Sequence, residues 1–322
     1  MLSTRFTERF AVDHPIMAAP MGGLSDARLA AAVSAAGALG SLQALHPTKP
    51  AEWVVEQIAA TRAATDRPFA VGFISDFVRF DQPRFDAVMA ARVPVIALSF
   101  GAPGPYIAAA HAAGALAICQ VQTVQQAIEA VDAGTDALAT QGTEAGGHTG
   151  TMGLLPLLGS VLDACPDVPV LAAGGVASGR TLASGRTLAG VLAMGADGAW
   201  IGSAFIATTE ATPAVPGTKD LIVASDGADT VWTRAYDILD GRPWPEGIGE
   251  RVRANRFTER WDGQDDALRA QRDTVERPRG TDPEERDILY GQSAAFVHAV
   301  RPAAEVIDEI VADAERFLAG LK

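Results

Sequence analysis

The sequence has few cysteines and lacks long hydrophobic runs. Only Cys119 and Cys165 occur among its 322 residues, and two cysteines so far apart make neither a disulfide framework nor a zinc-binding spacing. We therefore expect no disulfide and no metal site. No apolar run reaches the roughly 18 residues of a membrane-spanning helix, and the first residues lack the hydrophobic stretch of a signal peptide. These absences predict a soluble, cytoplasmic protein without a membrane partner.

Blocks of like charge, low-complexity tracts and internal repeats of about 20 to 50 residues are also absent, which argues against charged tails and solenoid folds. The formal net charge is −13. A protein with this excess of negative charge is repelled by the phosphate backbone of a nucleic acid, so we expect no nucleic-acid partner. Solubility alone is enough to explain this net charge.

What the sequence does contain is a regular alternation of short apolar runs with longer alanine-rich stretches. Eight runs have the length and composition of buried strands: 16–19, 38–42, 69–73, 95–99, 116–120, 137–141, 170–173 and 199–202. Seven helices are expected between them, at 26–36, 51–64, 83–91, 105–113, 123–133, 155–164 and 187–194. Strands buried on both faces and alternating with helices indicate a parallel sheet, and eight such units predict an α/β fold, a (βα)8 TIM-type barrel. A doubly wound open sheet is the alternative, although no G-x-G-x-x-G follows the first strand.

The pattern changes after the eighth strand, where prolines and glycines interrupt every long periodicity. We therefore assign the barrel to residues 1–204 and a mostly helical or irregular extension over the barrel mouth to residues 205–322. The extension ends in an amphipathic helix with an apolar stripe from Val306 to Leu321. Such a stripe docks against the barrel or against a partner subunit, so the sequence permits a homodimer.

The most informative segment is 141–150, with the sequence QGTEAGGHTG, directly after the sixth strand. Gly146, Gly147 and Gly150 allow the backbone to approach a ligand closely. His148 has a side chain that titrates near neutral pH. Because the active face of such a barrel lies at the carboxyl ends of its strands, this loop is expected to form part of a cofactor site. A histidine that only hydrogen-bonds a backbone carbonyl is the simpler alternative, and Glu144 is expected to orient the loop.

A second glycine-rich region lies at the last two strands. Gly174 and Gly175 follow the seventh strand, and the run 200–203, with the sequence WIGS, ends the eighth. Unobstructed main-chain N–H groups at these two positions are typical of the phosphate site of such barrels. Tight corners between strands and helices would also explain the glycines.

One segment between these glycines is duplicated: residues 177–182 read ASGRTL, and residues 183–188 repeat them. Six residues make about 1.7 helical turns, so an insertion inside a helix would turn its buried face away from the core. We expect a local bulge, with the second copy leading the helix.

Four segments together resemble the nitronate monooxygenase family: PIMAAPMGG at 15–23, EAGGH at 144–148, AAGG at 172–175 and YGQ at 290–292. The resemblance implies an FMN-dependent barrel enzyme. Such an enzyme oxidises alkyl nitronates or nitroalkanes with dioxygen to a carbonyl compound plus nitrite.

Residue by residue, the resemblance implies that His148 is the catalytic base. It also implies a set of cofactor-binding residues: Ala19, Pro20, Met21, Gly22, Gly72, Gln120, Gln141, Gly146, Gly147, Gly174, Gly175, Trp200, Ile201, Gly202 and Ser203. The sequence departs from the family at Gly72, where many members have asparagine, and in the duplicated segment, which lengthens the spacing between the two phosphate-binding segments.

Two other functions are compatible with the same motifs. FMN-dependent NAD(P)H:quinone reductases and enoyl-thioester reductases share the barrel and a similar Gly-Gly-His loop. A flavin-binding protein without catalytic activity is the other alternative, against which His148 and Glu144 argue.

Overall fold

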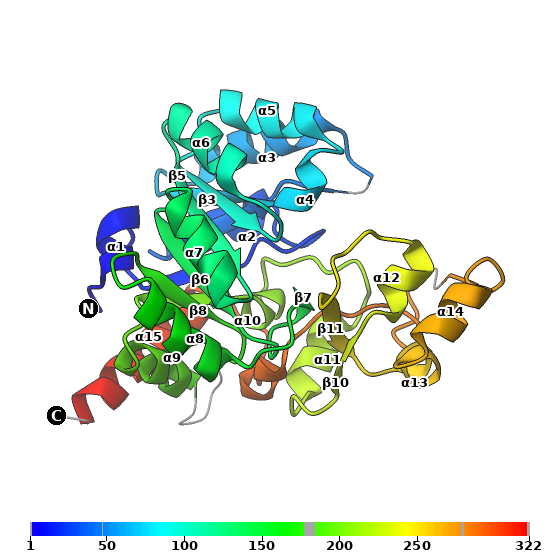
Figure 1. Ribbon diagram of the computed structural model, residues 1–322. Helices are drawn as coiled ribbons and strands as arrows, with labels where there is room; N and C mark the ends of the chain where they lie inside the picture. Colours follow the sequence, from blue (N-terminus) through cyan, green and yellow to red (C-terminus); the bar gives the residue numbers. More distant parts are fainter. Residues whose placement is uncertain (1, 47, 177–183, 278–279, 321–322) are drawn as a thin grey trace.

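The computed structural model describes residues 2–46, 48–176, 184–277 and 280–320 (Figure 1). Eight parallel strands form one sheet in the order β1-β9-β8-β6-β5-β4-β3-β2. A parallel bridge between Met17 and Leu39 joins its two edges, and the amide of Leu39 donates to the carbonyl of Ile16 at 2.9 Å. The sheet therefore closes into the predicted barrel, and the doubly wound alternative is wrong.

The predicted strands and helices are all present, with ends that differ by a few residues. The strands are β1 (Ile16–Ala18), β2 (Gly40–Gln43), β3 (Phe69–Ile74), β4 (Val95–Ser99), β5 (Leu116–Val121), β6 (Ala137–Gln141), β8 (Val170–Ala173) and β9 (Gly198–Ile201). The helices between them are α2 (Ala27–Ala35), α3 (Ala51–Ala64), α4 (Ser75–Val78), α5 (Gln82–Ala90), α6 (Gly104–Ala112), α7 (Val124–Asp132), α8 (Leu154–Ala164) and α9 (Ser184–Ala193).

Local capping explains where several helices begin. The Asp26 carboxylate accepts from the amides of Arg28 and Leu29 at the start of α2, and the Thr123 hydroxyl accepts from Gln126 at the start of α7. These groups satisfy amides that have no partner within the helix. The α9 helix begins at Ser184, in the second copy of the duplicated segment. Residues 177–183 lie outside the described part of the chain, so the bulge stays a prediction.

The barrel has two apolar layers. Its interior combines alanines, such as Ala70, Ala97 and Ala139, with bulky residues, of which Trp200 is the largest. A short helix that the sequence did not reveal, α1 (Arg5–Phe10), contributes Phe6 and Phe10 to this interior cluster. A larger apolar layer lies between the strands and the surrounding helices.

The extension contains a small antiparallel sheet as well as helices. Its strands β10 (Thr230–Thr233) and β11 (Gly249–Arg253) are joined by β7 (Gly147–Thr149), which comes from the glycine-rich loop of the barrel. The loop that carries His148 is therefore a strand of the extension's sheet (Figure 1). The other elements are α10 (Ser203–Ile206), α11 (Thr218–Ala224), α12 (Ala235–Asp240), α13 (Arg256–Trp261), α14 (Asp265–Gln271), the 3-10 helix η1 (Gln292–Phe296) and α15 (Ala303–Gly320).

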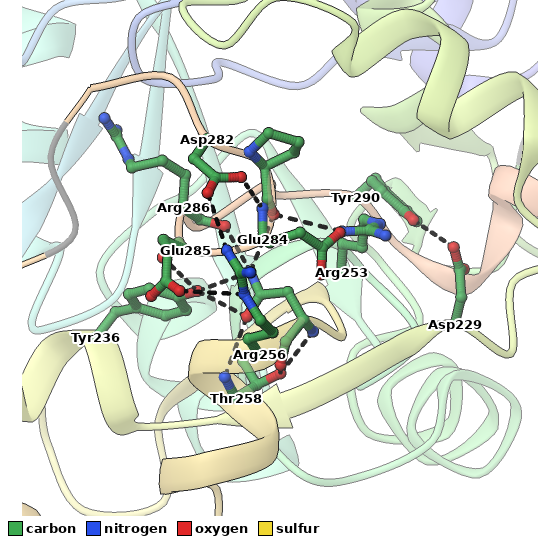
Figure 2. Close-up of polar contacts among 12 residues, drawn as sticks. Asp229, Tyr236, Arg253, Arg256, Thr258, Asp282, Glu284, Glu285, Arg286 and Tyr290 are labelled. Atoms are coloured by element: carbon green, nitrogen blue, oxygen red, sulfur yellow. Dashed lines mark hydrogen bonds and ion pairs between the residues drawn. The ribbon is translucent and has the colours of Figure 1, made fainter.

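The chain beyond α14 is fastened by polar contacts (Figure 2). Arg253 pairs with Glu284 at 2.8 Å, and Arg256 pairs with Asp282 at 3.0 Å. The Tyr290 hydroxyl donates to Asp229 at 2.5 Å, and the Tyr290 side chain is fully buried. These contacts fix the course of the segment that reaches the glycine-rich loop.

The terminal helix α15 returns to the barrel and packs against α9 and α2. Its apolar stripe is buried there, including Ile307, Ile310 and Ala314. Of the two partners predicted for this stripe, the barrel is the one that it contacts. None of the described helices is both long enough and apolar enough to span a membrane.

Candidate active site

A cavity lies at the carboxyl ends of the barrel strands, as the position of the glycine-rich segments predicts. Gln43, Ser99, Gln120, Gln141 and Trp200 line it from the ends of five different strands. Trp244, Leu289 and Ser293 line it from the extension. Barrel and extension thus build the site together.

Most of the residues predicted to bind the cofactor are brought together in this cavity. Those among its lining residues are Ala19, Pro20, Met21, Gly22, Gln120, Gln141, Gly146, Gly147, Gly174, Trp200, Gly202 and Ser203, together with the predicted base His148. Gly72, Gly175 and Ile201 are not among the lining residues.

The structure explains why Gly72 has no side chain. A Cβ atom at this position would lie 2.3 Å from Cβ and 2.5 Å from Cγ of Pro20. Pro20 itself lines the cavity. The space that an asparagine side chain needs is thus occupied by the proline ring, and Gly72 supports the cavity wall from behind.

Two glutamines form a chain of amides beside the cavity. Gln122 donates from Nε2 to Oε1 of Gln141 at 2.9 Å, and Gln141 donates from Nε2 to the backbone carbonyl of His148 at 3.1 Å. Gln141 was predicted to contact the flavin, but both ends of its amide bind protein groups. Its first effect is to hold the backbone of His148 in place.

His148 is fixed by a carboxylate from the extension. Its Nε2 atom lies 3.0 Å from Oδ1 and 2.9 Å from Oδ2 of Asp237, which is buried on α12. Arg242 approaches the other side of the same carboxylate, with Nη1 3.5 Å from Oδ1. The alternative that His148 only hydrogen-bonds a backbone carbonyl is therefore wrong for its side chain. A carboxylate accepts hydrogen bonds only, so Nε2 carries a proton and Nδ1 is the free nitrogen.

An aromatic ring covers the imidazole. The Trp244 ring stacks on His148 with centroids 3.9 Å apart and planes inclined by 20°. Trp244 also contacts Phe77 at 4.9 Å and Phe100 at 5.0 Å between centroids. Phe100 adopts φ 59°, a region that is costly for a residue with a side chain and is found most often at functional sites. Trp244 is thus both an anchor of the extension and a wall of the cavity.

A second carboxyl group lies beside this pair. Glu250 is directly opposite His148 in the pairing of β11 with β7. It is fully buried, and neither carboxyl oxygen has a hydrogen-bond partner among the described residues. Burial, together with the negative charges of Asp237 and Asp287, raises the pKa of Glu250 well above its usual value.

The rest of the glycine-rich loop is held by its own backbone and by Glu144. The Glu144 carboxylate accepts from the amide of Leu154 at 3.0 Å, which orients the loop as predicted. A Cβ on Gly146 would lie 2.4 Å from the carbonyl carbon of Tyr290 and 2.5 Å from the amide nitrogen of Gly291. The glycine is therefore required by the extension packed against it.

The cavity fits a flavin, the cofactor that the sequence resemblance implies. A Cβ on Gly22 or Gly147 would have no atom within 4 Å, so these backbones border open space. Gln43 lines the cavity, and its buried Oε1 atom accepts no hydrogen bond from any described residue. An unpartnered amide oxygen suits a ring N–H donor. Gly174 and Gly202 also line the cavity, where a glycine main chain can offer N–H groups to a phosphate.

Sequence reasoning missed Asp237, Glu250 and Trp244 as residues of the site. Asp237 is 89 positions from His148, so no local spacing connects the two. Both acids lie in a region that the sequence pattern predicts only as mostly helical or irregular. The pairing of β11 with β7, which places Glu250 beside His148, is visible only in the structure.

Comparison with known proteins agrees with this geometry. The profile of the nitronate monooxygenase family matches residues 3–83 and 74–313. A (3aS,4S,5R,7aS)-5-hydroxy-7a-methyl-1-oxo-octahydro-1H-indene-4-carboxyl-CoA dehydrogenase of Rhodococcus jostii is 36% identical over 243 residues, which are 75% of this chain and 65% of that protein. The chain spans less than two thirds of the length of the first curated relatives that it matches.

Two solved structures match along the whole chain. FabK from Thermotoga maritima has a TM-score of 0.85 and 28% identity, covering 100% of this chain and 99% of that one. Nitroalkane oxidase from Streptomyces ansochromogenes has a TM-score of 0.80 and 28% identity, covering 99% and 100%. With its barrel, its glycine-rich loop and a family match over nearly its full length, the chain belongs to the nitronate monooxygenase family of oxidoreductases.

Proposed function

We propose that this protein binds FMN and oxidises alkyl nitronates and nitroalkanes with dioxygen to a carbonyl compound and nitrite, with His148 as the general base. The observation that carries the proposal is the contact of His148 Nε2 with Asp237, which leaves Nδ1 of a cavity-lining imidazole free to accept a proton. The similarity to nitroalkane oxidase from Streptomyces ansochromogenes supports the substrate class.

His148 acts on the substrate carbon. The α-carbon of a nitroalkane is acidic, and a general base is effective when its pKa lies near the working pH. His148 removes the α-proton: the C–H bond breaks, an N–H bond forms at Nδ1, and the electron pair stays on the substrate as the nitronate. Asp237 then stabilises the imidazolium, as a carboxylate does behind any histidine base.

FMN, when bound, supplies the redox chemistry by taking electrons from the nitronate and passing them to dioxygen. The chain's contribution is to hold the cofactor and to shape the space above it. Gln43 and Gln120 offer amide groups to the ring, and Gly174, Gly202 and Ser203 offer a glycine-rich cradle to the phosphate. Trp244 and Phe100 close one side of the cavity with aromatic rings, which exclude water from the nitronate.

Anaerobic mixing of the flavin-loaded protein with propyl nitronate tests the proposal. We expect the nitronate to bleach the flavin absorbance rapidly and NADH to bleach it slowly or not at all. Admission of air should then restore the absorbance and release nitrite. A protein that NADH bleaches rapidly and that does not react with propyl nitronate would overturn the proposal.

The second candidate is an FMN-dependent reductase of a quinone or an enoyl thioester. The observation in its favour is the similarity to the carboxyl-CoA dehydrogenase of Rhodococcus jostii, which is 36% identical to this chain. The same anaerobic experiment separates the two candidates, because the reductase requires NAD(P)H as its electron donor.

A further inference from the structure

Glu250 is placed against the candidate base by the small sheet of the extension. On β11, it pairs with His148 of β7 on one side and with Thr233 of β10 on the other. Paired residues of neighbouring antiparallel strands project to the same face of the sheet. One carboxyl oxygen of Glu250, one of Asp237 and one ring nitrogen of His148 lie within 4.8 Å of one another.

The surroundings of Glu250 contain more acids than bases. Asp237, Asp240 and Asp287 act on it with negative charge, and Arg242 acts with positive charge. Arg242 is already engaged by Asp240 at 2.7 Å and by Asp237 at 3.5 Å. Among the described residues, the phenol of Tyr236 also interacts electrostatically with Glu250, and His148 lies beside it.

Ionisation of Glu250 would therefore raise the free energy of the folded protein by an unusually large amount. A buried carboxylate normally accepts several hydrogen bonds, and an unpaired buried charge costs far more than an unpaired neutral group. Glu250 receives none from the described residues. The repulsion between two adjacent carboxylates is removed when one of them takes up a proton.

We propose that Glu250 is a positioning residue that holds a proton beside the His148–Asp237 pair, so that His148 faces one negative charge instead of two. The inference rests on the proposed function only for its catalytic consequence. When Asp237 carries the one negative charge beside the ring, it fixes the imidazole by a hydrogen bond and Nδ1 stays available to accept a proton. A second charge would stabilise the imidazolium and leave no free base.

A protonated Glu250 explains the site better than a metal ion does. Nε2 of His148 is at hydrogen-bond distance from both oxygens of Asp237. A cation bound at Nε2 would displace that hydrogen bond and leave the ring proton on Nδ1. The base would then be lost.

The first test measures stability against pH for the flavin-loaded wild type and for Glu250→Gln, which keeps the shape of a protonated carboxyl group. Glu246→Gln, an exposed position in the preceding turn, is the matched control. Because the pKa of Glu250 is raised in the folded protein, the wild type must lose stability as pH rises above the ordinary carboxyl range, whereas Glu250→Gln must not. The unfolding constant of the wild type should increase relative to the variant by up to about tenfold per pH unit in that window.

The second test follows turnover of propyl nitronate and nitroethane. We expect Glu250→Gln to keep kcat/KM within about threefold of the wild type at pH 6 and to lose the alkaline fall of the wild-type profile. Glu250→Ala should lose at least about tenfold on nitroethane, because the carboxyl partner of Asp237 is removed. Activity retained in Glu250→Gln and lost in Glu250→Ala would show that position 250 needs a neutral hydrogen-bonding group and not a negative charge.

Three outcomes would overturn the proposal: parallel stability profiles for wild type and Glu250→Gln, a stoichiometric metal ion in the purified wild type, or activity in Glu250→Ala equal to that in Glu250→Gln. If the glutamine variant does not fold, infrared spectra of the wild type decide, since a protonated carboxyl band that disappears near neutral pH contradicts the inference. A wild type without nitronate turnover would refute the proposed function alone, because stability and infrared measurements need no substrate.

Discussion

The carboxylate of Asp237 lies 2.9 Å from Nε2 of His148, although the two residues are 89 positions apart in the sequence. His148 belongs to a loop of the barrel, and Asp237 belongs to a helix of the extension. The candidate base is therefore completed only when the extension folds over the barrel. Activity should depend on residues that the barrel alone does not contain.

Asp237→Asn tests this relationship directly. An asparagine amide can donate to Nε2, which moves the ring proton to Nδ1 and removes the free base. We expect kcat/KM for nitroethane to fall on the order of 100-fold, the usual contribution of general base catalysis, while flavin absorbance is retained. Asp266→Asn, at a fully exposed position of α14, is the control. Wild-type kinetics in Asp237→Asn would contradict the assignment.

His148→Ala distinguishes proton removal from substrate binding. A nitroalkane still carries its α-proton, whereas a nitronate has already lost it. We expect turnover of nitroethane to fall about 100-fold or more and turnover of propyl nitronate to fall less, with FMN still bound. The substrates are compared by nitrite release in parallel assays, with His111→Ala on the outer surface as control. Equal kinetics of wild type and variant on both substrates would rule out His148 as the general base.

The sequence predicted the barrel well and the site only in part, for a physical reason. The strands and helices of the barrel follow from short-range periodicity, and the glycines at their ends follow from backbone geometry. Asp237, Glu250 and Trp244 reach the cavity through pairing between β7 and β11 and through packing of the extension. Such long-range contacts leave no spacing in the sequence.

Gly72→Asn restores the residue that many relatives have, and we expect it to harm this protein. Its Cβ would lie 2.3 Å from Cβ of Pro20, so the cavity wall must shift. Overpacking of this kind typically costs about 1–3 kcal/mol. We expect a lower thermal midpoint and weaker FMN binding, measured by calorimetry and flavin fluorescence. Tighter FMN binding in Gly72→Asn would show that the wall accommodates the side chain.

Both thiols should be unreactive in the folded protein. Cys119 is 1% exposed, and burial raises its pKa to about 12. Burial also raises the pKa of Cys165. Because the thiolate is the reactive form, a raised pKa leaves very little of either thiol ionised at pH 8. We expect no reaction with a disulfide reagent such as Ellman's until denaturant is added, when two thiols should react. Rapid labelling of the native protein would contradict this burial.

Gly146→Ala should separate the barrel loop from the extension. The added methyl group would lie 2.4 Å from the carbonyl carbon of Tyr290 and 2.5 Å from the amide nitrogen of Gly291, and neither backbone atom can rotate away. We expect a loss of about 1–3 kcal/mol in stability and a loss of nitronate turnover, since the segment that bears His148 must move.

Gly159→Ala on α8 is the matched control, because its Cβ would meet no atom within 4 Å. An alanine there favours the helix, so Gly159→Ala should raise the thermal midpoint slightly. If Gly146→Ala instead keeps both stability and turnover, the contact between loop and extension does not hold the site.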